Sequence, residues 1–103
     1  MFRSIYKRII EDFAFLRKFG FSYSCSIKSH IVPTVLFKKG DLGIRIGFNY
    51  EEEKMHIEWL PFLDAIEGYL LSESVEWKGS SYKDQIKSAQ QFVKSFLKEQ
   101  TEL

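Results

Sequence analysis

The chain has 103 residues, of which 45% are hydrophobic and 17% aromatic, and its formal net charge is +1. Such a composition excludes a disordered chain, because large apolar side chains can bury enough surface to form a core. The near-neutral charge argues against a protein dominated by nucleic-acid contacts, and no apolar run approaches the roughly 20 residues that span a bilayer. We expect a single domain over residues 1–103.

Charge is unevenly distributed along this chain. Residues 1–50 carry nine Lys or Arg and three Asp or Glu, whereas residues 51–79 carry two Lys and eight Asp or Glu. Either the surface is dipolar and orients a charged partner, or the fold mixes these segments and cancels the dipole.

The chain has one cysteine, Cys25, which cannot form an intramolecular disulfide. Charged residues recur every few positions near the N-terminus, so the apolar run of a signal peptide is missing there. We expect a cytoplasmic protein in which Cys25 is a small buried thiol.

Residues 2–19 have the period of an amphipathic helix. Its apolar arc includes Ile5, Ile9, Phe13 and Leu16. On one flank, Arg8 and Asp12 have the spacing of an ion pair. Gly20 follows and accepts the left-handed conformation that ends helices, so the pattern predicts one helix over residues 2–19.

Residues 22–60 have the pattern of an antiparallel meander. Large apolar residues alternate strictly with small or polar ones over residues 42–50, which indicates a strand with one buried face. Three more strands are expected over residues 22–28, 31–38 and 55–60. The serine-rich first strand is expected at a sheet edge, and Gly40 in a tight turn.

The register follows from keeping the apolar side chains on one face. The expected pairs across the turn at Gly40 are Val35 with Ile46 and Phe37 with Ile44. The expected pairs across the next turn are Tyr50 with Met55, Phe48 with Ile57 and Ile46 with Trp59.

Residues 61–79 have no clean period and predict either a short helix over residues 63–69 or an edge strand near residues 70–75. A last amphipathic helix then begins, where Ser81 and Asp84 have the spacing of a capping box. This order predicts an α+β domain with an N-terminal helix, an antiparallel meander of three to five strands and a C-terminal helix. Both helices are expected on one face of the sheet, which leaves the other face open.

The open face is expected to carry Arg45, Asn49, His56 and Glu58 beside a shallow groove at Gly43 and Gly47. These residues either do acid–base work or form a solvated face with one cross-strand ion pair, and we favour the ion pair. Two histidines and one cysteine are too few ligands for a metal site, and no phosphate-binding loop or hydrolase motif occurs. We therefore expect no metal, no cofactor and no catalytic residue.

Acidic residues cluster at the turn after residue 50 and in the connector that follows. There we expect a partner-binding surface, in which carboxylates orient a basic partner and aromatic side chains anchor it. The residues of this predicted surface are Glu51, Glu52, Glu53, Glu58, Asp64, Glu67, Tyr69 and Trp77. The alternative interpretation of the three consecutive glutamates is a solubilising turn.

The last predicted helix carries a stripe of lysines, Lys83, Lys87, Lys94 and Lys98. Such a stripe either follows the phosphates of a nucleic acid or is a solvated helix edge. No arginine accompanies it, so we favour the solvated edge.

Two segments resemble those of a diffuse group of small bacterial α+β proteins. They are the end of the first helix, with Phe15, Leu16, Lys18, Gly20 and Phe21, and the strand–turn–strand of residues 43–60. Many members of that group are uncharacterised, and some are regarded as immunity proteins of toxin systems. The resemblance implies no catalytic residues, and it implies a basic partner such as a toxin that acts on nucleic acid.

The sequence thus favours a non-enzymatic protein-binding domain, with an immunity-type inhibitor of a bacterial toxin as its specific form. A nucleic-acid-binding accessory domain that uses the lysine stripe is the alternative. A small enzyme that uses His56 and Glu58 ranks third.

Overall fold

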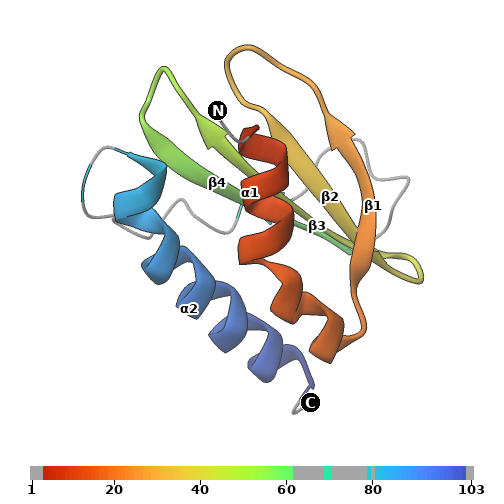
Figure 1. The fold of residues 1–103 in the computed structure, drawn as a ribbon. Helices are drawn as coiled ribbons and strands as arrows, with labels where there is room; N and C mark the ends of the chain where they lie inside the picture. The colour runs from red at the N-terminus through yellow and green to blue at the C-terminus, as the bar shows by residue number, and fades with distance from the viewer. Residues whose placement is uncertain (1–3, 62–68, 71–78, 80, 102–103) are drawn as a thin grey trace.

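The computed structural model describes residues 4–61, 69–70, 79 and 81–101. Its elements in chain order are α1 (Ile5–Asp12), the 3-10 helix η1 (Ala14–Phe19), β1 (Ser22–Ile27), β2 (Thr34–Lys39), β3 (Leu42–Asn49), β4 (Lys54–Leu60), β5 (Tyr69–Leu70) and α2 (Tyr82–Thr101). The predicted α+β class, with a strand meander between two helical segments, is confirmed (Figure 1).

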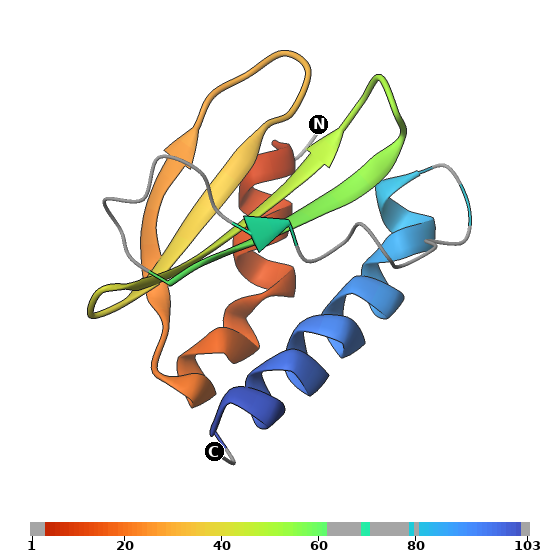
Figure 2. The same ribbon diagram turned by 180° about the vertical axis from the view of Figure 1, so that it is seen from behind.

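The five strands form one antiparallel sheet in the order β1-β2-β3-β4-β5, so each strand pairs with its neighbours in the chain. Both helices cover the same face of this sheet, and the other face is turned toward the viewer in Figure 2. The two edge strands are β1, as its serines predicted, and the two-residue β5.

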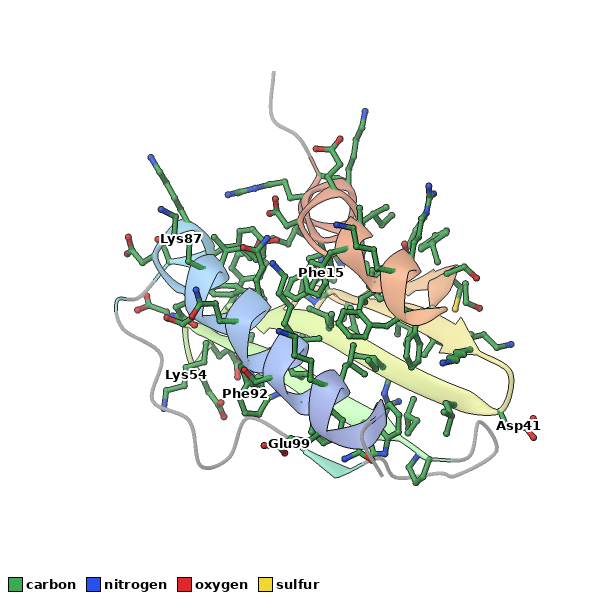
Figure 3. The ribbon with its side chains drawn as sticks, turned by 90° about the horizontal axis from the view of Figure 1, so that it is seen from below. Phe15, Asp41, Lys54, Lys87, Phe92 and Glu99 are labelled. Carbon is green, nitrogen blue, oxygen red and sulfur yellow. The ribbon has the colours of Figure 1, made fainter. Side chains whose placement is uncertain are left out.

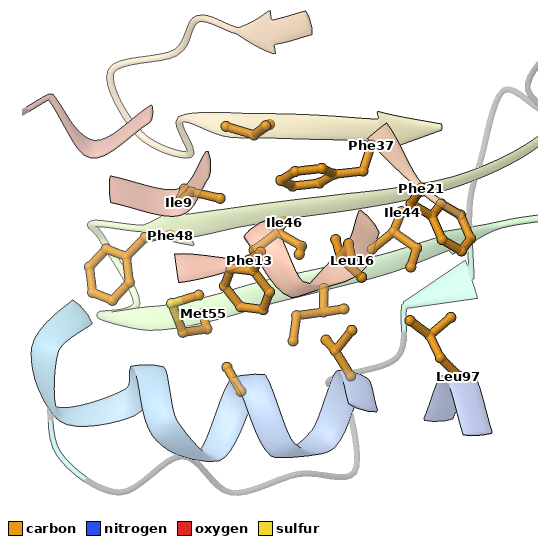
Figure 4. Packing of buried hydrophobic residues seen from close by; sticks show 14 of the residues in the cluster. Ile9, Phe13, Leu16, Phe21, Phe37, Ile44, Ile46, Phe48, Met55 and Leu97 are labelled. Carbon is orange, nitrogen blue, oxygen red and sulfur yellow. The ribbon is translucent and has the colours of Figure 1, made fainter. Parts of the chain in front are cut away.

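The core lies between the helices and the covered face of the sheet (Figure 4). Alternation in β2, β3 and β4 points every second side chain toward the helices. The buried residues from the strands include Val35, Phe37, Ile44, Ile46, Phe48, Met55 and Ile57. Those from the helices include Ile9, Phe13, Leu16, Tyr82, Ala89, Val93 and Leu97.

The first predicted helix is only partly correct. The α-helix begins after Ser4, whose side chain accepts a hydrogen bond from the Lys7 N–H at 3.2 Å, and it ends at Asp12. The chain then continues as η1, which Gly20 ends with the expected positive φ of 90°. In a 3-10 helix, side chains three residues apart lie in a row, so this change of geometry keeps Phe13 and Leu16 both buried against the sheet.

The predicted register across the β2–β3 turn is confirmed. Val35 pairs with Ile46 and Phe37 with Ile44, and Gly40 has a φ of 58° in the two-residue turn. The short turn leaves few alternative pairings, because a one-residue slip would turn the apolar side chains to the wrong face.

The predicted register across the β3–β4 turn is wrong by two residues. Phe48 pairs with Met55, and Ile46 with Ile57. The turn starts one residue earlier than expected, because the Asn49 side chain accepts hydrogen bonds from the N–H groups of Glu51 and Glu52, at 2.9 Å each. Asparagine commonly forms such side-chain turns.

Cys25 is exposed, which corrects the expected buried thiol. Strand β1 lies at the sheet edge, and its pairing with β2 is interrupted by an irregularity between Tyr23 and Cys25. Five of its six residues are exposed, so the strand holds Cys25 away from the core.

Candidate functional site

The turn after β3 projects four consecutive exposed residues from one end of the sheet: Tyr50, Glu51, Glu52 and Glu53, called the acidic tip below. Asn49 fixes the first half of this turn through its two hydrogen bonds to backbone N–H groups. Glu53 has a φ of 55°, which non-glycine residues rarely adopt. The three carboxylates are thus presented by a backbone of defined shape.

A buried side chain from α2, Gln85, holds the other half of the acidic tip. Its exposed fraction is 0%. Its Oε1 accepts a hydrogen bond from the Met55 N–H at 2.8 Å, and its Nε2 donates to the Glu53 carbonyl at 2.6 Å and to the Gly79 carbonyl at 3.0 Å. One amide therefore joins the tip, β4 and the segment before α2.

Gln85 is not among the site residues predicted from the sequence. The available signal was its position: it lies on the same helical face as Tyr82 and Ala89, among the apolar residues of α2. A polar residue on such a face is expected to bind partners inside the fold.

Tyr50 is 53% exposed, whereas the alternation of residues 42–50 placed it on the buried face. Its backbone N–H donates to the Ile31 carbonyl at 2.8 Å, and its ring contacts Phe48 edge-on, with 5.2 Å between centroids. Ile31 itself is 45% exposed. An aromatic ring and an aliphatic side chain are therefore available to a partner beside the carboxylates.

Tyr50 lines two pockets at this end of the molecule. The β1–β2 loop, the start of α1 and the acidic tip come together there (Figure 1). The first has a volume of about 520 Å³ and is lined in part by Tyr6, Lys28 and His30. The second, about 320 Å³, lies between α1, the acidic tip and the start of α2. Ile5 and Tyr50 line both pockets.

Arg8 and Asp12 do not form the predicted ion pair within α1. Instead both contact Tyr82 of α2: the Tyr82 hydroxyl donates to Asp12 Oδ2 at 2.7 Å, and the Arg8 guanidinium lies 4.5 Å from the centroid of the Tyr82 ring. Burial, followed by the hydrogen bond to Asp12 and the charge of its carboxylate, raises the pKa of Tyr82 far above its usual value, against the opposing effect of Arg8.

The raised pKa of Tyr82 predicts a loss of stability at alkaline pH. The folded state keeps the phenol proton, whereas the unfolded chain releases it near pH 10, so stability is full below that pH and falls above it. For one proton the slope is about −1.4 kcal/mol per pH unit. Urea titrations between about pH 9 and 11 measure the free energy of unfolding, and we expect Tyr82→Phe to remove this slope. An equal slope in wild type and Tyr82→Phe would contradict the assignment.

The open face of the sheet differs from the predicted one. Arg45 lies directly opposite Glu58 and forms an ion pair with it, so these two charges neutralise each other. Asn49 is only 8% exposed, because it caps the turn. Gly43 and Gly47 are buried, and at Gly47 the Thr34 side chain and the Pro33 carbonyl fill the space beside the glycine.

His56 is half-buried on the same face, and its Nε2 lies 3.3 Å from a carboxylate oxygen of Glu52. It therefore contacts the acidic tip through Glu52, and no contact with Glu58 is found among the described residues. Among the residues that the structure describes, no three His, Cys, Asp or Glu side chains gather as a metal site would require.

Three members of the predicted acidic surface, Glu51, Glu52 and Glu53, are brought together in the turn, whereas Glu58 lies farther along β4, opposite Arg45. Asp64, Glu67 and Trp77 lie outside the described residues. Tyr69 belongs to β5, where its backbone pairs with Trp59.

The lysines of the predicted stripe are all exposed on α2. The ammonium group of Lys94 lies 4.7 Å from the centroid of the Phe15 ring, which occupies the space between η1 and α2 (Figure 3). None of the described helices is both long and apolar enough to cross a membrane.

Comparison with known proteins adds no assignment. Neither a scan against models of protein families nor searches of curated proteins and of solved structures found a match for this chain.

Proposed function

We propose that the protein is a non-enzymatic binding domain whose acidic tip docks onto a basic protein. The observation that carries this proposal is the exposed Tyr50 ring, held by a fixed turn and followed by three exposed carboxylates. Exposed aromatic residues supply binding energy at interfaces, and charges around them orient the partner and raise the association rate.

The rigidity of the turn supports this proposal. Asn49 and Gln85 together make five hydrogen bonds that hold residues 49–55 and Gly79. A binding surface that is already ordered loses less conformational entropy when the partner docks, so more of the contact energy contributes to affinity.

The specific form that we propose is an immunity-type inhibitor of a bacterial toxin. Toxins that act on nucleic acid carry basic surfaces to bind phosphates, and an acidic tip complements such a surface. The candidate partner is the product of the adjacent gene, which we expect to be basic and which is to be co-expressed with this chain.

Charge reversal of the tip tests the proposal. We expect Glu51→Lys with Glu52→Lys to slow association with the co-expressed partner by at least about tenfold at low ionic strength, with little effect at about 0.5 M salt. Surface plasmon resonance measures both rates. We expect Tyr50→Ala to act mainly on the dissociation rate, because it removes a contact made only in the complex.

Asp41→Lys with Glu99→Lys is the matched control, since it changes the net charge equally. Asp41 lies at the far end of the sheet from Lys54, and Glu99 lies near the end of α2 (Figure 3). If both double variants slowed association equally, the association rate would depend on the net charge of the protein and not on the position of the charges in the acidic tip. Failure to recover a complex with the adjacent gene product would refute the immunity-type assignment.

A nucleic-acid-binding domain is the second candidate. The helices α1, η1 and α2 carry eight Lys or Arg and four Asp or Glu, so the helical layer is net positive. A mixed oligonucleotide pool at low salt tests this candidate by gel retardation. A retarded band that weakens in Lys83→Ala and Lys87→Ala would favour it, and no retardation excludes it.

A further inference from the structure

The pocket of about 320 Å³ between α1, the acidic tip and the start of α2 has the composition of a small-ligand site. We propose that it binds a carboxylate carried on a compact apolar or aromatic body. This site shares Tyr50 and Glu53 with the acidic tip, but its cationic side chains, Arg8 and Lys83, belong to the helices, so the inference goes beyond the protein-binding function.

Arg8 is the group that recognises the carboxylate. Its guanidinium is stacked on the Tyr82 ring, with 4.5 Å to the centroid, and its side chain is half-buried in the wall of the pocket. Within the described part of the chain, the Arg8 guanidinium makes no hydrogen bond and no ion pair; its contact there is with the Tyr82 ring. A guanidinium that contacts a ring through its face keeps its N–H donors available, and these donors match the two oxygens of a carboxylate.

The neighbouring acid does not occupy these donors. Asp12 instead accepts the hydrogen bond of the Tyr82 hydroxyl, at 2.7 Å. Tyr82 therefore has two roles in this wall: its ring orients Arg8, and its hydroxyl holds Asp12.

A second cation and an apolar surface complete the pocket. Lys83 lines it from the first turn of α2, while Phe48 and Tyr50 line it from the end of β3 and the tip. Glu53 is the one acid in the lining, against the two cations Arg8 and Lys83. The balance of charge favours an anion, and the aromatic rings favour an apolar body attached to it.

The volume restricts the ligand to a small molecule or a single side chain. Pockets for drug-sized ligands span about 300–1,000 Å³, so this pocket is at the lower limit. A single aromatic ring with one carboxylate matches both its size and its lining.

Sodium benzoate and benzamide are the probes, because they have nearly the same shape and differ in charge. In two-dimensional NMR titrations of the full chain, we expect benzoate to shift the backbone amides of Tyr50 and Lys83 saturably in the millimolar range. Benzamide should give shifts at least about fivefold smaller at the same concentration.

A blocked glutamate peptide, acetyl-Gly-Glu-Gly-amide, is the third probe in these titrations and represents an acidic side chain of a protein partner. Tighter binding of benzoate than of this peptide assigns the pocket to a free small ligand. Tighter binding of the peptide assigns it to an acidic side chain of a partner, and the carboxylate remains the recognised group in either case.

Arg8→Gln should weaken benzoate binding at least about tenfold, and Lys83→Gln by a smaller factor. Arg17→Gln, at an exposed position of η1 outside this pocket, is the matched control and should leave binding unchanged. Equal responses to benzoate and benzamide, no saturation, or equal affinity of wild type and Arg8→Gln would overturn the proposal. The double variant Glu51→Lys with Glu52→Lys should retain benzoate binding. The carboxylate site and the protein-binding function can therefore be refuted independently of each other.

Discussion

We expect Ile46→Asp to unfold the domain. Ile46 is 0% exposed and lies in the middle of β3, between Val35 and Ile57 on the neighbouring strands. Its replacement removes a buried aliphatic side chain and places an uncompensated carboxylate among the apolar side chains of the described core. The expected loss exceeds about 4 kcal/mol, most of the stability of a domain of this size. Circular dichroism and urea titration measure the result.

Arg45→Gln is the control for this substitution, one residue along the same strand and on the opposite face. Gln is chosen because Asp would place a second carboxylate opposite Glu58. Loss of the half-exposed ion pair should cost about 1 kcal/mol or less. If Arg45→Gln destabilised the fold as much as Ile46→Asp, the sheet would depend equally on both faces.

Gln85→Leu has the second largest expected effect, a loss of about 3 kcal/mol in the free energy of unfolding. Leucine has a similar volume but cannot replace the three hydrogen bonds to Met55, Glu53 and Gly79. Each buried polar group that loses its partner costs about 1–3 kcal/mol. Urea titration gives the global value, and hydrogen exchange at residues 50–55 reports whether the tip opens first.

Gln91→Leu provides the matched control, because Gln91 is exposed on the same helix. We expect a change within about 0.5 kcal/mol. Equal effects of the two substitutions would show that the amide of Gln85 contributes little and that the tip is held by its own turn alone.

The elements that could be predicted from the sequence are those set by local periodicity. Strict alternation identified β3, helical spacing identified α1 and α2, and a two-residue turn at Gly40 fixed the β2–β3 register. In each case the pattern depends on neighbours a few residues apart, where a sequence is informative.

The details that could not be predicted depend on side-chain contacts. The β3–β4 register differs from the predicted one because Asn49 caps the turn. The alternation of apolar and polar residues does not reveal such a hydrogen bond. The Asp12–Tyr82 contact joins residues 70 positions apart, so it requires the tertiary fold. Of the candidate site, the acidic residues of the tip were identified from composition, whereas the exposure of Tyr50 and the stacking of Arg8 were not.

The exposed position of Cys25 on the edge strand has a practical use. It is the only cysteine in the chain, so a maleimide dye would attach at one defined place without any engineered substitution. Most of β1 faces solvent, and a label there would displace no core side chain. The natural sequence thus carries its own handle for fluorescence anisotropy or single-molecule measurements of complex formation.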